Sequence, residues 1–83
     1  MYDVEVTSAA RKELKKLSKK KQQRFFEIIE FLKEFPYSGK KLSGELQGYY
    51  SVRLWPYRVI YTADRKKKKV TVVAVKHRRE SYR

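Results

Sequence analysis

The spacing of apolar residues along the chain changes near the N-terminus, and the change predicts two kinds of element. Tyr2, Val4 and Val6 alternate with polar residues, which is the spacing of a half-buried β-strand. From Ala10 to Phe35 apolar side chains recur every three or four residues, which is the spacing of amphipathic helices. The sequence therefore predicts a strand followed by a helical region.

Capping residues divide this helical region into two helices. Thr7 or Ser8 can begin the first helix and Ser18 the second, because a side-chain oxygen can accept a hydrogen bond from an unpaired backbone N–H. Pro36 ends the second helix. The expected core positions of the two helices are Ala10, Leu14 and Leu17, then Phe25, Ile28, Ile29, Leu32 and Phe35.

The second half of the chain predicts a loop and three strands. Residues 37–48 contain all three glycines and are typical of a loop with a short extended piece. Alternating spacing returns over 50–54 and 57–62, and the β-branched run 70–75 predicts a buried strand after the charged turn at 64–69. The order is thus β-α-α-β-β-β. We expect one α+β domain over residues 1–83, with the helical hairpin packed on one face of a small, mainly antiparallel sheet.

The connection at Trp55–Pro56 fixes which residues face each other on the central strands. A connection of two or four residues keeps the apolar side chains on the helix side of the sheet. The resulting pairs are Arg53 with Arg58, Val52 with Val59, and Tyr50 with Tyr61. Because like charges directly opposite each other destabilise a strand pair unless an anion bridges them, this register predicts a phosphate site on the open face.

Composition and charge narrow the classes of function. The chain has 83 residues, no Cys, one His, and 22 Lys and Arg against 9 Asp and Glu, for a net charge of +13. Disulfide scaffolds and thiolate zinc sites are therefore excluded. No apolar stretch approaches a membrane span and no signal-peptide pattern is present, so we expect a cytoplasmic protein without a membrane partner.

The basic residues are concentrated in the second half of the chain. Residues 40–83 hold thirteen basic and three acidic residues (net +10), whereas residues 1–39 hold nine and six (net +3). The net charge of +13 for the whole chain exceeds the value of about 2–8 that solubility needs in a small domain. It favours a polyanionic partner, either nucleic acid or the ribosome.

The open face of the predicted sheet gathers side chains suited to single-stranded RNA. An arginine side chain can bind two oxygens of a phosphate at once, and aromatic rings stack on bases. A solvated face of exposed cations is the alternative interpretation, above all for the lysine-rich turn. The candidates for binding RNA or the ribosome are Lys40, Lys41, Trp55, Arg65, Lys66, Lys67, Lys68, Lys69 and Arg79.

The candidate chemistry is cleavage of RNA by its own 2′-hydroxyl, which needs no metal or small-molecule cofactor. Such a reaction requires a base, an acid and cations that stabilise the developing charge. Arg53, Arg58 and Arg78 are the candidate charge stabilisers, and Tyr82 and His77 are the candidate proton-transfer groups. The three glutamates of the second helix are more consistent with ion pairs along the helix than with a metal site.

Three segments resemble the RelE/ParE toxin superfamily. They are residues 41–54 (KLSGELQGYYSVRL), residues 57–61 (YRVIY) and residues 77–83 (HRRESYR). The resemblance covers essentially the whole chain and implies a toxin neutralised by a co-encoded antitoxin. RelE-like members cut mRNA in the ribosomal A site without metal, whereas ParE-like members inhibit DNA gyrase.

The resemblance also implies residue roles. It assigns phosphate contact to Arg58, and it carries the basic residue of the preceding strand over to Arg53. Arg78 and Tyr82 match the arginine and tyrosine of the C-terminal motif. A lysine of the RelE enzymes is replaced here by Ser51, so its proton-transfer role falls to another residue, and the candidates are Lys41 and His77.

Three functions therefore remain in view. We expect a RelE-type ribosome-dependent endoribonuclease with mRNA, the ribosome and an antitoxin as partners. The alternatives are a ParE-like gyrase inhibitor and a basic nucleic-acid-binding module. The first is favoured because the arginines and the C-terminal tyrosine are predicted on one face.

Overall fold

The computed structural model describes residues 1–81, and it confirms the predicted order of elements with two additions. The additions are a 3₁₀ turn within the predicted loop and a short helix at the C-terminal side, while the two-residue strand is the short extended piece expected in that loop. The elements are β1 (Asp3–Val6), α1 (Ser8–Lys15), α2 (Lys19–Glu34), β2 (Lys40–Lys41), the 3₁₀ turn η1 (Gly44–Leu46), β3 (Tyr50–Leu54), β4 (Tyr57–Asp64), β5 (Lys69–His77) and α3 (Arg78–Ser81).

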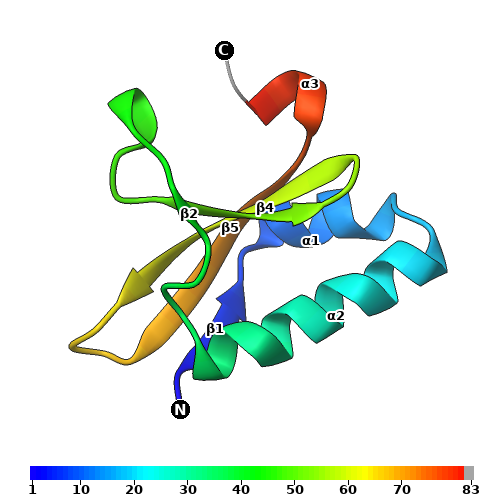
Figure 1. Ribbon diagram of the computed structural model, residues 1–83. Coiled ribbons are helices and arrows are strands. Elements are labelled where there is room, and N and C mark those ends of the chain that lie inside the picture. The colour runs from blue at the N-terminus through cyan, green and yellow to red at the C-terminus, as the bar shows by residue number, and fades with distance from the viewer. Residues whose placement is uncertain (82–83) are drawn as a thin grey trace.

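The strands form one mixed sheet in the order β1-β5-β4-β3-β2. β1 pairs with β5 in parallel, and the other three pairs are antiparallel. A parallel neighbour requires a long crossover connection, which the helices and the other strands provide. Figure 1 shows α1 and α2 together on one side of the sheet, with η1 and α3 on the opposite side. The predicted α+β fold with a helical hairpin on a mainly antiparallel sheet is confirmed.

The predicted helix starts are confirmed by their hydrogen bonds. The Thr7 hydroxyl accepts from the backbone N–H of Ala10 at 3.2 Å, and the Ser18 hydroxyl accepts from the N–H of Lys21 at 3.2 Å. Each bond satisfies an N–H that the first turn of a helix leaves unpaired. The Thr7 hydroxyl also lies 3.3 Å from the carbonyl of Val73, so the start of α1 is tied to β5.

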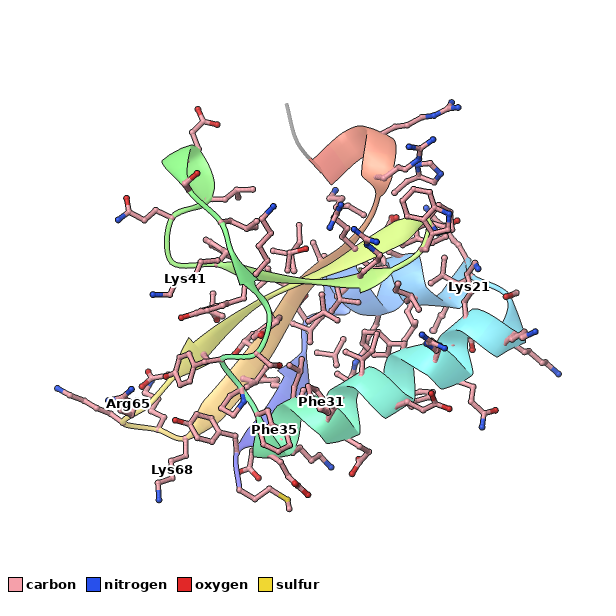
Figure 2. All side chains as sticks on the ribbon, viewed as in Figure 1. Lys21, Phe31, Phe35, Lys41, Arg65 and Lys68 are labelled. Atoms are coloured by element: carbon pink, nitrogen blue, oxygen red, sulfur yellow. The ribbon has the colours of Figure 1, made fainter. Side chains whose placement is uncertain are left out.

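The core lies between the helical hairpin and the sheet. Its fully buried side chains include Phe25 and Leu32 of α2 together with Val59 and Tyr61 of β4. Phe35 was expected in this core, and that expectation is wrong, because the residue is 53% exposed. At Phe35 the backbone leaves the helical conformation, so the ring departs from the apolar face and packs on Phe31 at 5.0 Å between centroids (Figure 2).

The predicted register of the central hairpin is confirmed. Trp55 and Pro56 form a two-residue connection, and Arg53 pairs with Arg58, Val52 with Val59, and Tyr50 with Tyr61. The β4–β5 pairing contains a bulge that the sequence did not reveal. Ile60 pairs with Ala74 and Tyr61 with Val72, so one residue of β5, Val73, is unmatched. A bulge of this kind reverses the faces of all residues beyond it.

Candidate nucleic-acid interface

A row of three cations crosses the sheet on the face opposite the helices. Arg53 on β3 pairs with Arg58 on β4, and Arg58 pairs with Lys76 on β5. Directly paired residues of antiparallel strands point to the same face, so the three side chains share one surface, which we call the arginine row. Arg53 and Lys76 are exposed, and Arg58 between them is half-buried. Such a row of like charges favours a bound anion.

Lys76 is a candidate site residue that the sequence did not reveal, and the bulge explains why. Without the bulge, uninterrupted alternation would pair Lys76 with Tyr57 on the helix side of the sheet. The shift between Ile60 and Tyr61 places Lys76 opposite Arg58 instead. No local feature of the β-branched run around Val73 signals the extra residue.

The same bulge takes His77 away from the arginine row. His77 pairs with Tyr57, and the two rings make an edge-to-face contact at 5.3 Å between centroids. Because Tyr57 packs against the helix-side core, the imidazole lies on the other side of the sheet from Arg58. Its Nδ1 accepts a hydrogen bond from the backbone N–H of Arg79 at 3.2 Å. The expectation that His77 joins the arginines is therefore wrong.

The indole of Trp55 brings two of the predicted arginines together. The guanidinium carbon of Arg78 lies 4.9 Å from the ring centroid and that of Arg53 lies 5.9 Å from it. Each contact is a cation–π interaction, worth about 0.5–1 kcal/mol at an exposed site. The N–H of Arg78 also donates to the carbonyl of Pro56 at 2.8 Å, which fixes the start of α3 beside the turn. Tyr82, the remaining candidate for this end of the sheet, lies outside the described residues.

The pairing of β2 with β3 places two neighbouring lysines near Ser51 on opposite faces of the sheet. Lys40 pairs with Ser51 and Lys41 with Tyr50. Lys40 therefore shares the face of the arginine row, whereas Lys41 lies on the helix-side face. Ser51 itself is only 4% exposed, and its hydroxyl has no hydrogen-bond partner in the described part of the chain. Of the two candidates for the missing family lysine, Lys41 and His77, neither lies on the face of the arginine row, and Lys40 does.

Tyr61 holds β2 in this position. Its buried hydroxyl accepts a hydrogen bond from the N–H of Gly39 at 3.0 Å, immediately before Lys40. Burial raises the pKa of Tyr61, so the phenol stays protonated at neutral pH. A Cβ at position 39 would lie 2.6 Å from the Tyr61 oxygen, which leaves room for glycine alone. The buried hydroxyl thus sets the place of an exposed cation.

The lysine-rich turn lies at the other end of the sheet. Seven residues separate Arg58 from Arg65, which is about 23 Å along a strand at about 3.3 Å per residue. Figure 2 shows Arg65 and Lys68 at that end, far from Lys21. The Asp64 carboxylate accepts the N–H groups of Lys66 and Lys67 at 2.9 and 3.1 Å, which closes the turn. The structure therefore does not bring the turn and the arginine row together.

Lys69 was predicted in the charged turn, but it is the first residue of β5. Its ammonium group forms an ion pair with Glu5 of β1 at 2.5 Å. The hydrogen bond and charge of this partner lower the pKa of Glu5 and raise that of Lys69. A cation paired in this way links two strands and is less available to RNA than its neighbours.

One carboxylate of α2 forms the ion pair expected along the helix. Lys33 and Glu30 form the expected pair at 2.8 Å. Within the described residues, no group of three or more His, Asp or Glu side chains is placed to share a metal ion. The helices of this same region also include none long and apolar enough to cross a membrane.

The family comparison matches nearly the whole chain. Residues 4–82 match the family described as the ParE toxin of the type II toxin–antitoxin system parDE. No curated protein sequence matches significantly.

Solved structures give a consistent result. The RelBE2 toxin–antitoxin complex from Mycobacterium tuberculosis contains a chain 33% identical to this one, with a TM-score of 0.84 over 92% of this chain and 96% of that chain. A chain of the RelE–RelB complex from Pyrococcus horikoshii is 31% identical, with a TM-score of 0.80 over 96% and 98%. The isolated RelE toxin of E. coli is 25% identical, with a TM-score of 0.78 over 93% and 84%. The chain therefore belongs to the RelE/ParE superfamily of toxins from type II toxin–antitoxin systems.

Proposed function

We propose that this toxin is an endoribonuclease that cleaves mRNA in the ribosomal A site. The observation that carries the proposal is the arginine row, in which Arg58 is flanked by a cation on each side. A phosphodiester acquires negative charge as it is attacked, and cations held in place before the reaction stabilise that charge. Inhibition of a protein target does not require cations in this arrangement.

The reaction starts from the 2′-hydroxyl of the substrate itself. A base removes the 2′-OH proton as the O2′–P bond forms, and an acid protonates the leaving 5′-oxygen as the P–O5′ bond breaks. The products are a 2′,3′-cyclic phosphate and a 5′-hydroxyl. Neither a metal ion nor a cofactor is required, because the nucleophile belongs to the RNA.

The side chains divide these tasks by position. Arg58 binds the scissile phosphate, with Arg53 and Lys76 on either side of it, and Arg78 approaches over the Trp55 ring. Lys40 lies opposite Ser51 on the face of the arginine row, which makes it the candidate for the role of the missing family lysine. Tyr82 is the further proton-transfer candidate that the family resemblance supplies.

An antitoxin is the proposed protein partner. The similar chains from M. tuberculosis and P. horikoshii are found in toxin–antitoxin complexes. On this chain, the exposed rings of Phe31 and Phe35 pack on each other, and Phe31 lines the same hollow as Lys40 and Arg53. A partner segment with both apolar and acidic side chains is complementary to this surface. The proposal assigns the chain to the cytoplasm, where ribosomes and mRNA are found.

Inhibition of DNA gyrase is the second candidate function. The observation that favours it is the match to the ParE family over residues 4–82. A basic module that only binds nucleic acid is a third possibility, and it predicts binding without chemistry. Both alternatives predict that neither the wild-type protein nor an Arg58 variant cleaves mRNA.

Primer-extension mapping of mRNA on programmed ribosomes tests the proposal. We expect the wild-type protein to cut within the A-site codon, Arg58→Ala to abolish cutting and Tyr82→Phe to weaken it. Arg11→Ala is the matched control, because Arg11 is exposed on α1 away from the row, and it should cut normally. Intact mRNA in the presence of ribosome-bound wild-type protein would contradict the proposal, and a supercoiling assay with gyrase would then test the second candidate.

A further inference from the structure

A basic cleft lies between α2 and the Trp55–Pro56 turn, next to the arginine row. It encloses about 330 Å³. The hollow beside it, of about 520 Å³, shares Arg24 and Arg53 as lining residues, so the two hollows meet at these side chains. The residues lining the smaller hollow, which we call the α2 cleft, are Lys20, Lys21, Arg24, Arg53, Leu54 and Trp55.

The charges of the α2 cleft are of one sign. Four of its six lining residues are cationic and none is acidic. The neighbouring hollow includes Glu27, so an anion favours the α2 cleft over the larger space. Within the described residues, the ion pairs are formed by Lys16, Lys33 and Lys69, and no carboxylate pairs with a cation of the cleft.

The helix itself is destabilised by this clustering. Arg24 follows Lys20 by four residues and Lys21 by three, and both spacings place side chains next to each other on a helix. Like charges at these spacings weaken a helix. A bound anion relieves this unfavourable arrangement.

We propose that the α2 cleft binds a backbone phosphate of RNA other than the scissile phosphate. The inference rests on the proposed function in taking RNA as the ligand. Arg53 belongs to both the arginine row and the cleft, so an RNA strand bound on the row continues past Arg53 toward Lys21. Trp55 is 56% exposed at the mouth of the cleft, where its ring is available to a base of the same strand.

The salt dependence of the RNA-binding constant measures the number of such phosphate contacts. Each one contributes a slope of about 0.7 in a plot of log K against log salt concentration for a single strand. The test uses Lys20→Gln/Lys21→Gln, which removes two charges and keeps the backbone N–H of Lys21 that Ser18 caps. Lys12→Gln/Lys15→Gln on α1 is the control with the same loss of charge.

Two RNA probes distinguish the source of the phosphate. The first is a single-stranded RNA with a 2′-deoxy nucleotide at the scissile position, which binds without being cut. The second is the vacant ribosome. We expect the slope for Lys20→Gln/Lys21→Gln to fall by about 0.7 relative to wild type, which corresponds to the one phosphate contact of the cleft. A smaller slope with the oligonucleotide assigns the phosphate to the RNA strand that is cut. A smaller slope with the vacant ribosome, but not with the oligonucleotide, assigns it to ribosomal RNA.

An unchanged slope with both probes, or an equal fall in the control variant, would overturn the inference. Trp55 is the only tryptophan of the chain, so its fluorescence gives an independent signal from the cleft. RNA should change this emission in the wild type and change it less in Lys20→Gln/Lys21→Gln. These are binding measurements, so they remain interpretable if the wild type fails to cleave mRNA. In that event the cleavage proposal fails alone.

Discussion

Replacing Lys76 by glutamine should stabilise the free protein. Lys76 faces Arg58, which also faces Arg53, so the variant removes one of the two like-charge oppositions in the row. Charges directly opposite each other on antiparallel strands change stability by roughly 0.2–1 kcal/mol. For a domain of this size 1 kcal/mol corresponds to about 4–8 °C in melting temperature, so we expect a rise of about 1–8 °C.

Thermal unfolding followed by circular dichroism at low ionic strength measures this rise. Salt screens exposed charges, so the difference from wild type should shrink as salt is added. Sulfate should shrink it further, because an anion bound on the row removes the repulsion in the wild type. Lys12→Gln lowers the net charge equally on α1 and is the control. A melting temperature that falls in Lys76→Gln, or that rises as much in Lys12→Gln, would show that repulsion between Lys76 and Arg58 does not destabilise the sheet.

Three further changes test the contacts that support the site. Tyr61→Phe removes the acceptor of the Gly39 N–H and should lower the unfolding free energy by about 1 kcal/mol in urea titrations. Gly39→Ala should lower it by about 1–3 kcal/mol, because the new Cβ meets the Tyr61 oxygen at 2.6 Å. Glu5→Gln should be less stable than wild type at neutral pH. Because Lys69 lowers the pKa of Glu5 in the folded state, this difference is lost as the pH falls through that pKa.

Each of these three predictions has its own check. Tyr57→Phe is the control for Tyr61→Phe, because the Tyr57 hydroxyl makes no hydrogen bond within the described residues, and an equal loss in both variants would contradict the role of the Gly39 bond. Unchanged urea midpoints for Gly39→Ala would contradict the tight contact. A deficit of Glu5→Gln that persists in acid would mean that the ion pair with Lys69 is not its cause.

The sequence was sufficient for the elements whose spacing or caps are local. Ser18 caps the second helix as predicted, and Thr7, one of the two candidates, caps the first, because capping depends on one hydroxyl and the N–H groups of the next turn. The pairing of Arg53 with Arg58 was also predicted, since one face of the hairpin is apolar and the connection at Trp55–Pro56 is short.

The sequence was insufficient where the structure depends on pairing between distant segments. The bulge in β5 exchanges the faces of Lys76 and His77, and the run of β-branched residues around it contains no glycine or proline to mark it. The choice of Lys40 over Lys41 likewise depends on the register of a two-residue strand. The α2 cleft joins a helix to a turn some thirty residues away, so helix periodicity shows its lysines only as an exposed face.

A single substitution in the RNA shows whether the 2′-hydroxyl is the nucleophile. Wild-type toxin is incubated with ribosomes programmed with mRNA that carries either ribose or 2′-deoxyribose at the A-site cleavage position. We expect cutting of the ribose mRNA to a 2′,3′-cyclic phosphate and a 5′-hydroxyl, and no cutting of the deoxyribose mRNA, with equal binding of toxin to both complexes. Cleavage of the deoxyribose mRNA, or of neither mRNA by bound toxin, would contradict attack by the 2′-hydroxyl at the arginine row.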